Sequence, residues 1–303
     1  MQNLATQLNR DWEKDFKKWA QPPSETEEHR CENAVRQIRK AIAASEKLRN
    51  RNTEVFLQGS YRNRVNVRQD SDVDIGIVCY DTFFFDLPEG YSHEYFGINS
   101  PATYQYSRFK NDVEEALVDY FGKEAVTRGN KAFDIKANSY RVESDLAPFF
   151  EYRRYKSDGN YLKGVKLLPD SGGMLINWPE QHYDNGVVKN HTTNKKYKKL
   201  VRVLKKLCVE MTEENIAAAK SIPGFLIECM VYNVPPEYFR AETLKECVKY
   251  VLAYLSSSTM ENEKCKDWTE VSELKYLFHS TQKWTREAAF EFVIAAWIYV
   301  GFN

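Results

Sequence analysis

The chain has 303 residues, of which 43% are hydrophobic and 28% are charged, ordinary values for a globular protein with an apolar core. Lys and Arg together number 43, as do Asp and Glu, so the formal net charge is zero. This balance argues against a polycation that coats long nucleic acid, and any attraction for phosphate must come from a local patch.

The N-terminal residues are polar and charged and contain no apolar stretch of the kind that forms a secretory signal. No run of the sequence approaches the length of about 18–20 apolar residues that a membrane span needs. The six cysteines are scattered without paired spacing, which indicates reduced structural thiols and argues against a zinc site. We therefore expect a cytoplasmic protein with no membrane contact.

The first part of the chain mixes helices and strands. Ser24 and Glu27 form a capping-box pattern after two prolines, which predicts a helix that runs to about residue 50. A second helical periodicity covers residues 101–121, and Gly129-Asn130 is typical of a hairpin turn. The segments with strand-like patterns are 54–58, 73–79, 124–127, 132–136 and 140–150.

The pattern changes near residue 189, after which only helices are predicted. The helical segments are 195–211, 223–232, 241–255, 273–278 and 285–300. No Gly/Ser-rich linker separates the two parts, so a binding site in the cleft between them is the natural expectation.

Three aspartates are the candidate catalytic residues. Asp72 and Asp74 open an apolar strand, and because alternate residues of a strand face the same side, their carboxylates project together. Asp145 lies in another strand-like segment, and pairing of the two strands would bring all three together. Such a set would hold two Mg²⁺ ions, with Mn²⁺ as an alternative, about 3.5–4 Å apart for an in-line phosphoryl or nucleotidyl transfer. Asp145 would also help to deprotonate the attacking hydroxyl.

The turn formed by Gln58, Gly59 and Ser60 follows a short strand ahead of these aspartates. A glycine at a strand-to-helix turn lets backbone N–H groups approach phosphate oxygens, and Ser60 adds a hydroxyl donor. A Gly-Ser pair is usually an ordinary turn, and an Asp-x-Asp is usually a surface acid. Their joint order with a later aspartate is what indicates a nucleoside triphosphate as substrate.

The stretch from Phe56 to Tyr61, together with Asp70 to Asp74, resembles the DNA polymerase β-like nucleotidyltransferase superfamily. More narrowly, residues 177–186 and 228–235 resemble the CdnE clade of the bacterial cGAS/DncV-like nucleotidyltransferases (CD-NTases). The resemblance runs from about residue 25 to the C-terminal helices. It implies an α/β (α+β) nucleotidyltransferase core with a mixed sheet and an N-terminal helix over residues 1–188. A C-terminal helical lobe over residues 189–303 would follow, with the active site in the cleft between them.

The activity implied by this resemblance is synthesis of a cyclic dinucleotide from nucleoside triphosphates, among them UTP and ATP. Cyclic UMP-AMP and a di-pyrimidine product are both open, and the product would serve as a second messenger in anti-phage (CBASS) defence. Asp72, Asp74 and Asp145 match the family's metal-binding triad, and Gly59 and Ser60 match its triphosphate turn. The resemblance requires no long nucleic acid, and regulatory or effector proteins of the same operon are candidate partners.

Asn177 matches the position at which an asparagine accompanies a preference for uracil in this clade. Its amide carries both a donor and an acceptor, so it complements the O4 and N3–H edge of uracil but can also rotate to suit another base. The chemistry of the side chain alone would therefore not select uracil.

Seven cations lie between Lys195 and Lys206 in one predicted helix. A solvated basic face is the usual interpretation of such a run. Lys198, Arg202 and Lys205 nevertheless recur at i, i+4 and i+7 and share one side of the helix, so we predict that they contact the nucleotide. By the resemblance, Lys205 matches a basic residue that reaches the triphosphate.

Two further positions qualify the resemblance. Relatives usually carry a phosphate-contacting Ser where this chain has Gly224, and the backbone N–H of Gly224 at a helix start could substitute for it. His182 is predicted to be a satisfied loop histidine that the chemistry does not need.

Two rival functions remain open from the sequence. The same site could transfer a nucleotide to RNA, to a small molecule or to a protein, although the neutral net charge argues against long RNA. Alternatively, the chain could be a catalytically silent nucleotide-binding module, although decayed members of such superfamilies lose carboxylates that are all present here.

Overall fold

The computed structural model describes residues 10–67, 73–138 and 142–302. Its contacts divide the chain into two compact units. The sheet unit consists of Ser24–Arg62 and Arg68–Pro179, and the helical unit consists of Met1–Pro23, Asn63–Val67 and Glu180–Asn303. The helical unit thus takes in residues on both sides of the predicted boundary at 188/189, and that domain boundary stays a prediction.

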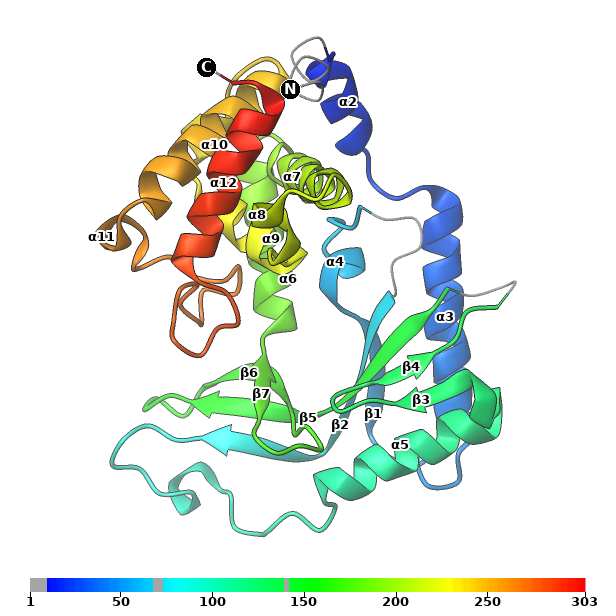
Figure 1. The fold of residues 1–303 in the computed structure, drawn as a ribbon. Coiled ribbons are helices and arrows are strands. Elements are labelled where there is room, and N and C mark those ends of the chain that lie inside the picture. The colour runs from blue at the N-terminus through cyan, green and yellow to red at the C-terminus, as the bar shows by residue number, and fades with distance from the viewer. Residues whose placement is uncertain (1–9, 68–72, 139–141, 303) are drawn as a thin grey trace. The chain divides into compact units, whose positions relative to one another are not determined.

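The sheet unit is built on a mixed sheet of seven strands within the described residues (Figure 1). Its strands are β1 (Thr53–Leu57), β2 (Val73–Asp86), β3 (Val126–Arg128), β4 (Phe133–Ile135), β5 (Ser144–Tyr155), β6 (Tyr161–Leu167) and β7 (Leu175–Asn177). Strands β2 and β5 run parallel and the other pairs are antiparallel. These two central strands contain two of the three predicted aspartates, Asp74 and Asp145.

Burial explains why β2 and β5 lie at the centre of the sheet. Residues 75–79 of β2 and 146–152 of β5 are almost continuously buried, as expected for strands covered on both faces. Helices α3 (Glu25–Ala44) and α5 (Tyr106–Phe121) pack on each other and against the strands, and Figure 1 shows them in blue and teal. The predicted capping box of Ser24 and Glu27 is present at the start of α3.

The short elements of the sheet unit are α4 (Gly59–Arg62), η1 (Glu94–Phe96) and η2 (Lys123–Ala125). The predicted hairpin turn joins β3 to β4, where the Gly129 N–H donates to the Ala132 carbonyl at 2.8 Å. Strands β6 and β7 were not predicted from the sequence, because β7 is only three residues long and β6 is exposed at its start.

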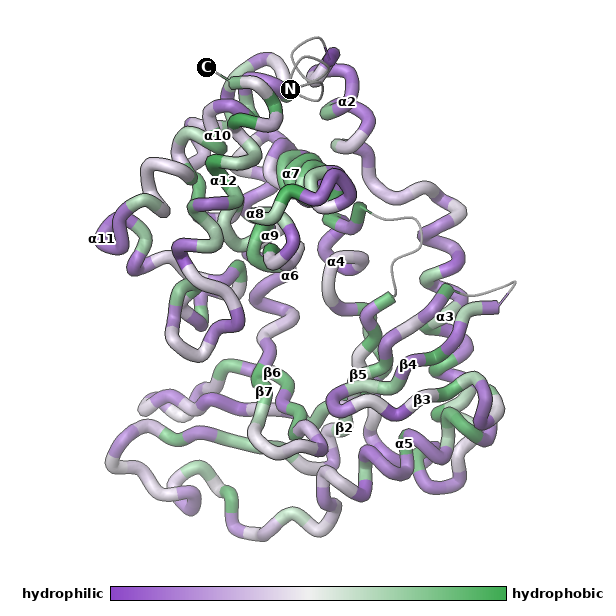
Figure 2. Tube along the Cα trace, viewed as in Figure 1, coloured by the Kyte–Doolittle hydropathy of each residue, from purple (hydrophilic) through white to green (hydrophobic). Residues whose placement is uncertain are grey.

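The helical unit packs its helices around a second hydrophobic core. Its elements are α2 (Trp12–Trp19), α6 (Pro179–Thr192, beginning at the last residue of the sheet unit), α7 (Tyr197–Glu213), α8 (Ala217–Lys220), α9 (Gly224–Asn233), η3 (Pro236–Phe239), α10 (Leu244–Thr259), α11 (Asn262–Cys265) and α12 (Arg286–Val300). Figure 2 shows hydrophobic residues gathered where α7 contacts α8 and α9. Among the described residues, no helix is both long and apolar enough to cross a membrane.

Three expectations for this part were wrong. Residues 273–278 form bends, a β-bridge from Tyr276 to Thr269 and a turn, with Glu273 at φ 61°, where the sequence predicts a helix. Helix α7 begins at Tyr197 and not at residue 195, because Asn194 and Lys195 both have positive φ. His182 lies on α6, not in a loop.

Candidate active site

The predicted site residues fall into two sets, one in each compact unit. The sheet unit contains Gln58, Gly59, Ser60, Asp74, Asp145 and Asn177, and the helical unit contains Lys198, Arg202 and Lys205. Asp72 is outside the described residues, so its place in the triad remains a prediction from strand alternation.

Asp74 and Asp145 are brought together by the pairing of the two central strands. They are register partners in the parallel ladder between β2 and β5, and each is half-buried. Neighbouring strands lie about 4.8 Å apart, and paired residues of a ladder face the same side of the sheet. Two of the predicted carboxylates therefore stand side by side on one face.

The Gly59 turn closes directly over Asp74. The Gln58 N–H donates to the Asp74 carbonyl at 2.9 Å, and the Gln58 side-chain amide donates to the Ile75 carbonyl at 3.3 Å. Gly59 has φ +64°, and a Cβ there would lie 2.1 Å from Asp74 Oδ2. Glycine is therefore required both by the left-handed backbone and by the close approach of the carboxylate. Ser60 follows as a half-buried residue of α4.

Asn177 ends β7 on the same face of the sheet as the two aspartates. Asn177 pairs with Val165 of β6, and Val165 pairs with Glu151 of β5. Glu151 follows Asp145 on β5 by an even number of residues, and residues so spaced face the same side of a strand. The Asn177 side chain is half-buried. Gly164 makes room for this strand end, because a Cβ at Gly164 would lie 2.9 Å from the Asn177 carbonyl oxygen.

Asp134 is an acidic neighbour that the sequence analysis missed. It lies on β4 as the register partner of Asp145, and it is exposed. The alternating stretch Phe133-Asp134-Ile135 after the hairpin turn was the available signal. Asp134 extends the row of carboxylates from Asp74 and Asp145 toward the edge of the sheet.

The donor chemistry of this row fits a divalent cation. Two carboxylates on neighbouring strands repel each other unless a cation or a proton lies near them, and hard oxygen ligands suit Mg²⁺. Within residues 10–67, 73–138 and 142–302, no group of three or more His, Cys, Asp or Glu side chains has metal-binding geometry. A complete triad therefore needs Asp72, which lies outside those ranges.

The three cations predicted on α7 have three different environments. Lys198 is half-buried, its ammonium lies 5.5 Å from the centre of the Tyr183 ring, and burial lowers its pKa. Arg202 is 5% exposed and donates hydrogen bonds to the carbonyls of Ala20 and Arg64. Burial, together with the nearby charge of Arg64, lowers the pKa of the Arg202 guanidinium to about 10. Arg202 thus links the backbone at Ala20 to the backbone at Arg64 through hydrogen bonds, and its predicted nucleotide contact stays a prediction.

Lys205 is 7% exposed and is held by a buried acid that the sequence analysis did not identify. Its ammonium lies 3.2 Å from Glu228 Oε2, and His182 Nε2 lies 2.8 Å from Glu228 Oε1. Burial alone would raise the pKa of Glu228, but Lys205 and His182 outweigh it and hold that pKa at about 2. His182 thus belongs to a charged cluster.

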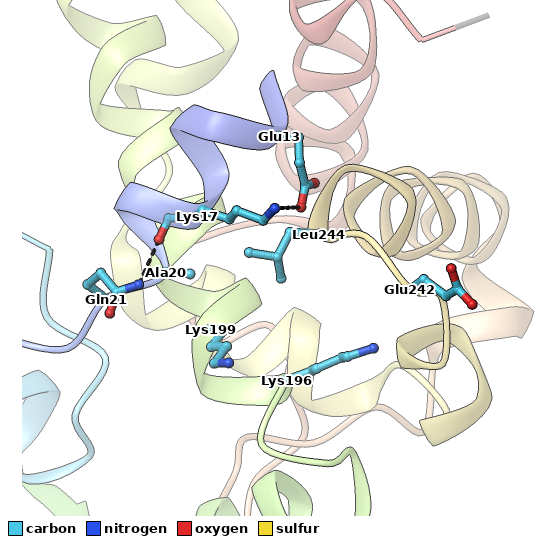
Figure 3. Close-up of a pocket in the computed structure, with 8 residues that line it drawn as sticks. All are labelled: Glu13, Lys17, Ala20, Gln21, Lys196, Lys199, Glu242 and Leu244. Atoms are coloured by element: carbon cyan, nitrogen blue, oxygen red, sulfur yellow. Dashed lines mark hydrogen bonds and ion pairs between the residues drawn. The ribbon is translucent and has the colours of Figure 1, made fainter. Parts of the chain in front are cut away.

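A separate pocket of about 210 Å³ lies elsewhere in the helical unit (Figure 3). Its lining residues are Glu13, Lys17, Ala20, Gln21, Lys196, Lys199, Glu242 and Leu244. Lys17 pairs with Glu13 at 3.4 Å, and Lys196 donates to the Ala241 carbonyl at 2.6 Å. None of the predicted site residues lines this pocket.

Comparison with known protein families gives one match in the second half of the chain. Residues 184–301 match the model of the cGAS/DncV-like nucleotidyltransferase C-terminal helical domain. This range covers most of the helical unit.

Relatives of known activity extend the similarity over nearly the whole chain. A cyclic dipyrimidine nucleotide synthase CdnE from Legionella pneumophila is 43% identical over 302 residues, covering 97% of this chain and 99% of the relative. An enzyme of the same name from Cecembia lonarensis is 42% identical over 285 residues, covering 94% and 96%.

A solved structure has the same fold. The structure of the Rhodothermus marinus CdnE c-UMP-AMP synthase with Apcpp and Upnpp superposes with a TM-score of 0.84 at 28% identity. The match covers 96% of this chain and 97% of that chain. The mixed sheet with C-terminal helices is thus the fold of this family, as the sequence predicted.

Proposed function

The chain belongs to the CdnE clade of the bacterial cGAS/DncV-like nucleotidyltransferases, and on that premise we propose that it is a cyclic dinucleotide synthase. Its substrates are nucleoside triphosphates, with UTP as at least one of them, and its product joins two pyrimidine nucleotides in a ring. A 3′-hydroxyl attacks an α-phosphate and pyrophosphate leaves, which forms a linear intermediate. A second transfer of the same kind closes the ring.

The observation that carries this proposal is the position of Asp74 and Asp145 beneath the Gly59 turn. The two carboxylates are register partners, and the turn approaches Asp74 so closely that any side chain at Gly59 would collide with it. A carboxylate pair beside a glycine turn offers acidic ligands and backbone donors in one place. That combination suits a triphosphate that arrives with its cations.

Asp74 and Asp145, with Asp72, are the residues that would hold two Mg²⁺ ions. The ions would supply charge neutralisation at the phosphate and would lower the pKa of the attacking hydroxyl. Asp145 takes up the hydroxyl proton, directly or through one water molecule. Gly59 and Ser60 orient the phosphates through backbone and hydroxyl donors, and Gln58 fixes the turn on β2.

The helical unit contributes positive charge. Besides burial, the charges of Arg202 and Arg64 lower the pKa of Lys198, and the charge of Arg64 lowers the pKa of Arg202. Lys205 pairs with Glu228, whose charge acts on Lys198 in the opposite sense. Burying several like charges is unfavourable, and a polyanionic ligand would relieve their repulsion. We propose that Lys198 and Lys205 contact the triphosphate.

The dipyrimidine product is proposed from the two relatives that match at 42–43% identity, both of which are cyclic dipyrimidine nucleotide synthases. Asn177 supports a uracil base, because its amide pairs with both the O4 acceptor and the N3–H donor. It also shares a sheet face with Asp74 and Asp145, as a base contact for the same substrate requires.

The test is product analysis with purified protein and Mg²⁺. Radiolabelled ATP, GTP, CTP and UTP are supplied singly and in pairs, and the products are treated with phosphatase and resolved. We expect a phosphatase-resistant product that incorporates UTP, and most product from pyrimidine pairs. Absence of UTP incorporation in every pairing would contradict the uracil assignment, and label that stays on a macromolecule would favour a transferase with another acceptor.

The role in anti-phage defence has its own test. The gene, expressed with its neighbouring operon genes, should lower phage plating, and the Asp145→Asn variant should restore it. Equal plating with the wild-type and variant genes would contradict a signalling role for the product.

A further inference from the structure

Glu228 sits at the centre of a buried charged cluster in the helical unit. Its side chain is 4% exposed, and each carboxylate oxygen has its own partner. Oε2 accepts from the Lys205 ammonium at 3.2 Å, and Oε1 lies 2.8 Å from His182 Nε2. The three side chains come from α9, α7 and α6, so the cluster fixes the relative position of three helices at one point.

The stem of Lys205 is confined as well as its ammonium. Gly224 opens α9 beside it, and a Cβ at Gly224 would lie 3.4 Å from Lys205 Cε and 3.5 Å from Cδ. The next residue of α9 contacts the third member of the cluster, because the ring of Phe225 lies 5.8 Å from the His182 ring. A lysine side chain normally samples many rotamers, and this packing restricts Lys205 to few of them.

The surrounding charge is positive. Lys198, Arg202 and Arg64 all lie near enough to influence one another electrostatically, and Glu228 acts on Lys198 in the opposite sense. A buried cation left without a counter-ion among other cations is strongly destabilised, and its side chain turns toward any route to solvent. Glu228 therefore both compensates the charge of Lys205 and limits where its ammonium can point.

We propose that Glu228 is a positioning residue for nucleotide binding, which holds Lys205 in the orientation that meets the triphosphate and is itself held by His182. The inference rests on the proposed function, because Lys205 is there a triphosphate contact. It assigns no proton transfer to Glu228 or His182, and it treats both as residues that act through Lys205.

The test is a double-mutant cycle in the full-length enzyme with Glu228→Gln and Lys205→Met. Glu228→Gln keeps the size of the side chain and removes its charge. We expect this change to raise KM for the nucleoside triphosphates about tenfold, with a smaller change in kcat. In the Lys205→Met background the same change should alter KM less than twofold, because the residue through which Glu228 acts is gone.

A purely structural role predicts a different pattern. The Glu228→Gln effect on KM would then be of equal size in both backgrounds, and that additivity would overturn the proposal, as would an unchanged or lowered KM in the single variant. Glu270→Gln is the matched control, because Glu270 is also a buried acid of the helical unit and contacts the neutral side chain of Gln282. It should leave KM unchanged.

A second cycle covers the case in which Glu228→Gln does not fold. His182→Asn removes the other partner of Glu228 at a residue that is less deeply buried. It should raise KM about threefold when Lys205 is present and leave KM unchanged in the Lys205→Met background. Additivity in this cycle also overturns the proposal. Failure of the proposed function itself is distinguishable, because the wild-type protein would then give no cyclic product with any nucleotide pair.

Discussion

The carboxylates of Asp74 and Asp145 in the sheet unit and the carboxylate of Glu228 in the helical unit lie in different environments. Asp74 and Asp145 are half-buried on neighbouring strands, where two like charges face the same side. Glu228 is enclosed and is paired with Lys205 and His182. Carboxylates that face the same side on neighbouring strands are chemically suited to bind a cation, and the carboxylate of Glu228 is paired with the Lys205 ammonium inside the protein. On the proposals above, the same functional group would bind cations in one unit and position a lysine in the other.

The largest expected effect separates Asp145 from its neighbour Asp134. Asp145→Asn removes the carboxylate that we propose to hold cations and to take up the hydroxyl proton, so cyclic product formation should fall about a thousandfold or more, ~4 kcal/mol in the barrier. Asp134→Asn changes the next residue of the same row, an exposed side chain on β4, and should reduce the rate less than threefold. Initial rates with UTP measure both, and thermal unfolding checks that both variants fold.

Equal losses in the two variants would mean that the whole row of carboxylates, and not the pair beneath the Gly59 turn, is the functional unit. Full activity of Asp145→Asn would place the active site elsewhere.

The ionic pairing of Glu228 can be tested by the pH dependence of the free energy of unfolding. The pKa of Glu228 is about 2 in the folded protein, against 4.5 for the ordinary side chain. A lowered folded-state pKa contributes stability that is fully present above pH 4.5 and is lost as pH falls toward 2. The contribution is about 3 kcal/mol at neutral pH. The free energy of unfolding in urea should therefore differ between wild type and Glu228→Gln by about this amount at pH 7 and by less than half as much near pH 3.

The matched control for this measurement is Glu261→Gln. Glu261 is an exposed acid that pairs with Lys264 at 2.8 Å on the surface, where ion pairs contribute little. Its variant should differ from wild type by less than about 0.5 kcal/mol at either pH. A Glu228→Gln difference that is the same at pH 7 and pH 3 would contradict the ionic account of the cluster.

Substitution of Gly59 tests whether activity needs the close approach of this turn to the Asp74 carboxylate. Gly59→Ala places a Cβ 2.1 Å from Asp74 Oδ2, so the turn or the carboxylate must move, and activity should fall about a hundredfold, ~2.7 kcal/mol. Gly90→Ala is matched in backbone, because Gly90 also has positive φ, but a Cβ there meets nothing within 4 Å. The positive φ alone should cost each variant about 1 kcal/mol of stability, the clash with Asp74 should add to this cost in Gly59→Ala, and Gly90→Ala should keep its activity. Comparable activity in the two would show that the close approach to Asp74 is not needed.

The sheet-unit half of the candidate site was predictable because its signals are local. Alternation placed Asp74 at the start of β2, and a glycine after a short strand marked the turn. The partnership with Asp145 needed only the pairing of two strongly apolar strands. The capping box of Ser24 and Glu27 is local in the same way, and the helix it predicts is present over Glu25–Ala44, short of the predicted end near residue 50.

The helical-unit half depends on contacts between residues far apart in the chain. Arg202 bonds to the carbonyls of Ala20 and Arg64, and Lys205 pairs with Glu228 on another helix, and no spacing rule shows either. Helix α6 escaped prediction because its sequence is rich in Asn, His and Gly, which have weak helix propensity. Residues 273–278 were predicted to be helical and are not, because six residues with helical periodicity are too few to nucleate a helix alone.

The smallest expected effect concerns Asn177, which we propose to affect the choice of base and not the rate. Asn177→Ser shortens the side chain and removes one of the two hydrogen bonds proposed to uracil, which amounts to about 1.4 kcal/mol or roughly a tenfold fall in the ratio of UTP to ATP incorporation. Met174→Ser, at an exposed residue just before β7, is the control and should leave the ratio unchanged. Competition with equal UTP and ATP measures the ratio directly. If Asn177→Ser slows both nucleotides equally, Asn177 supports the position of the strand end and does not read the base.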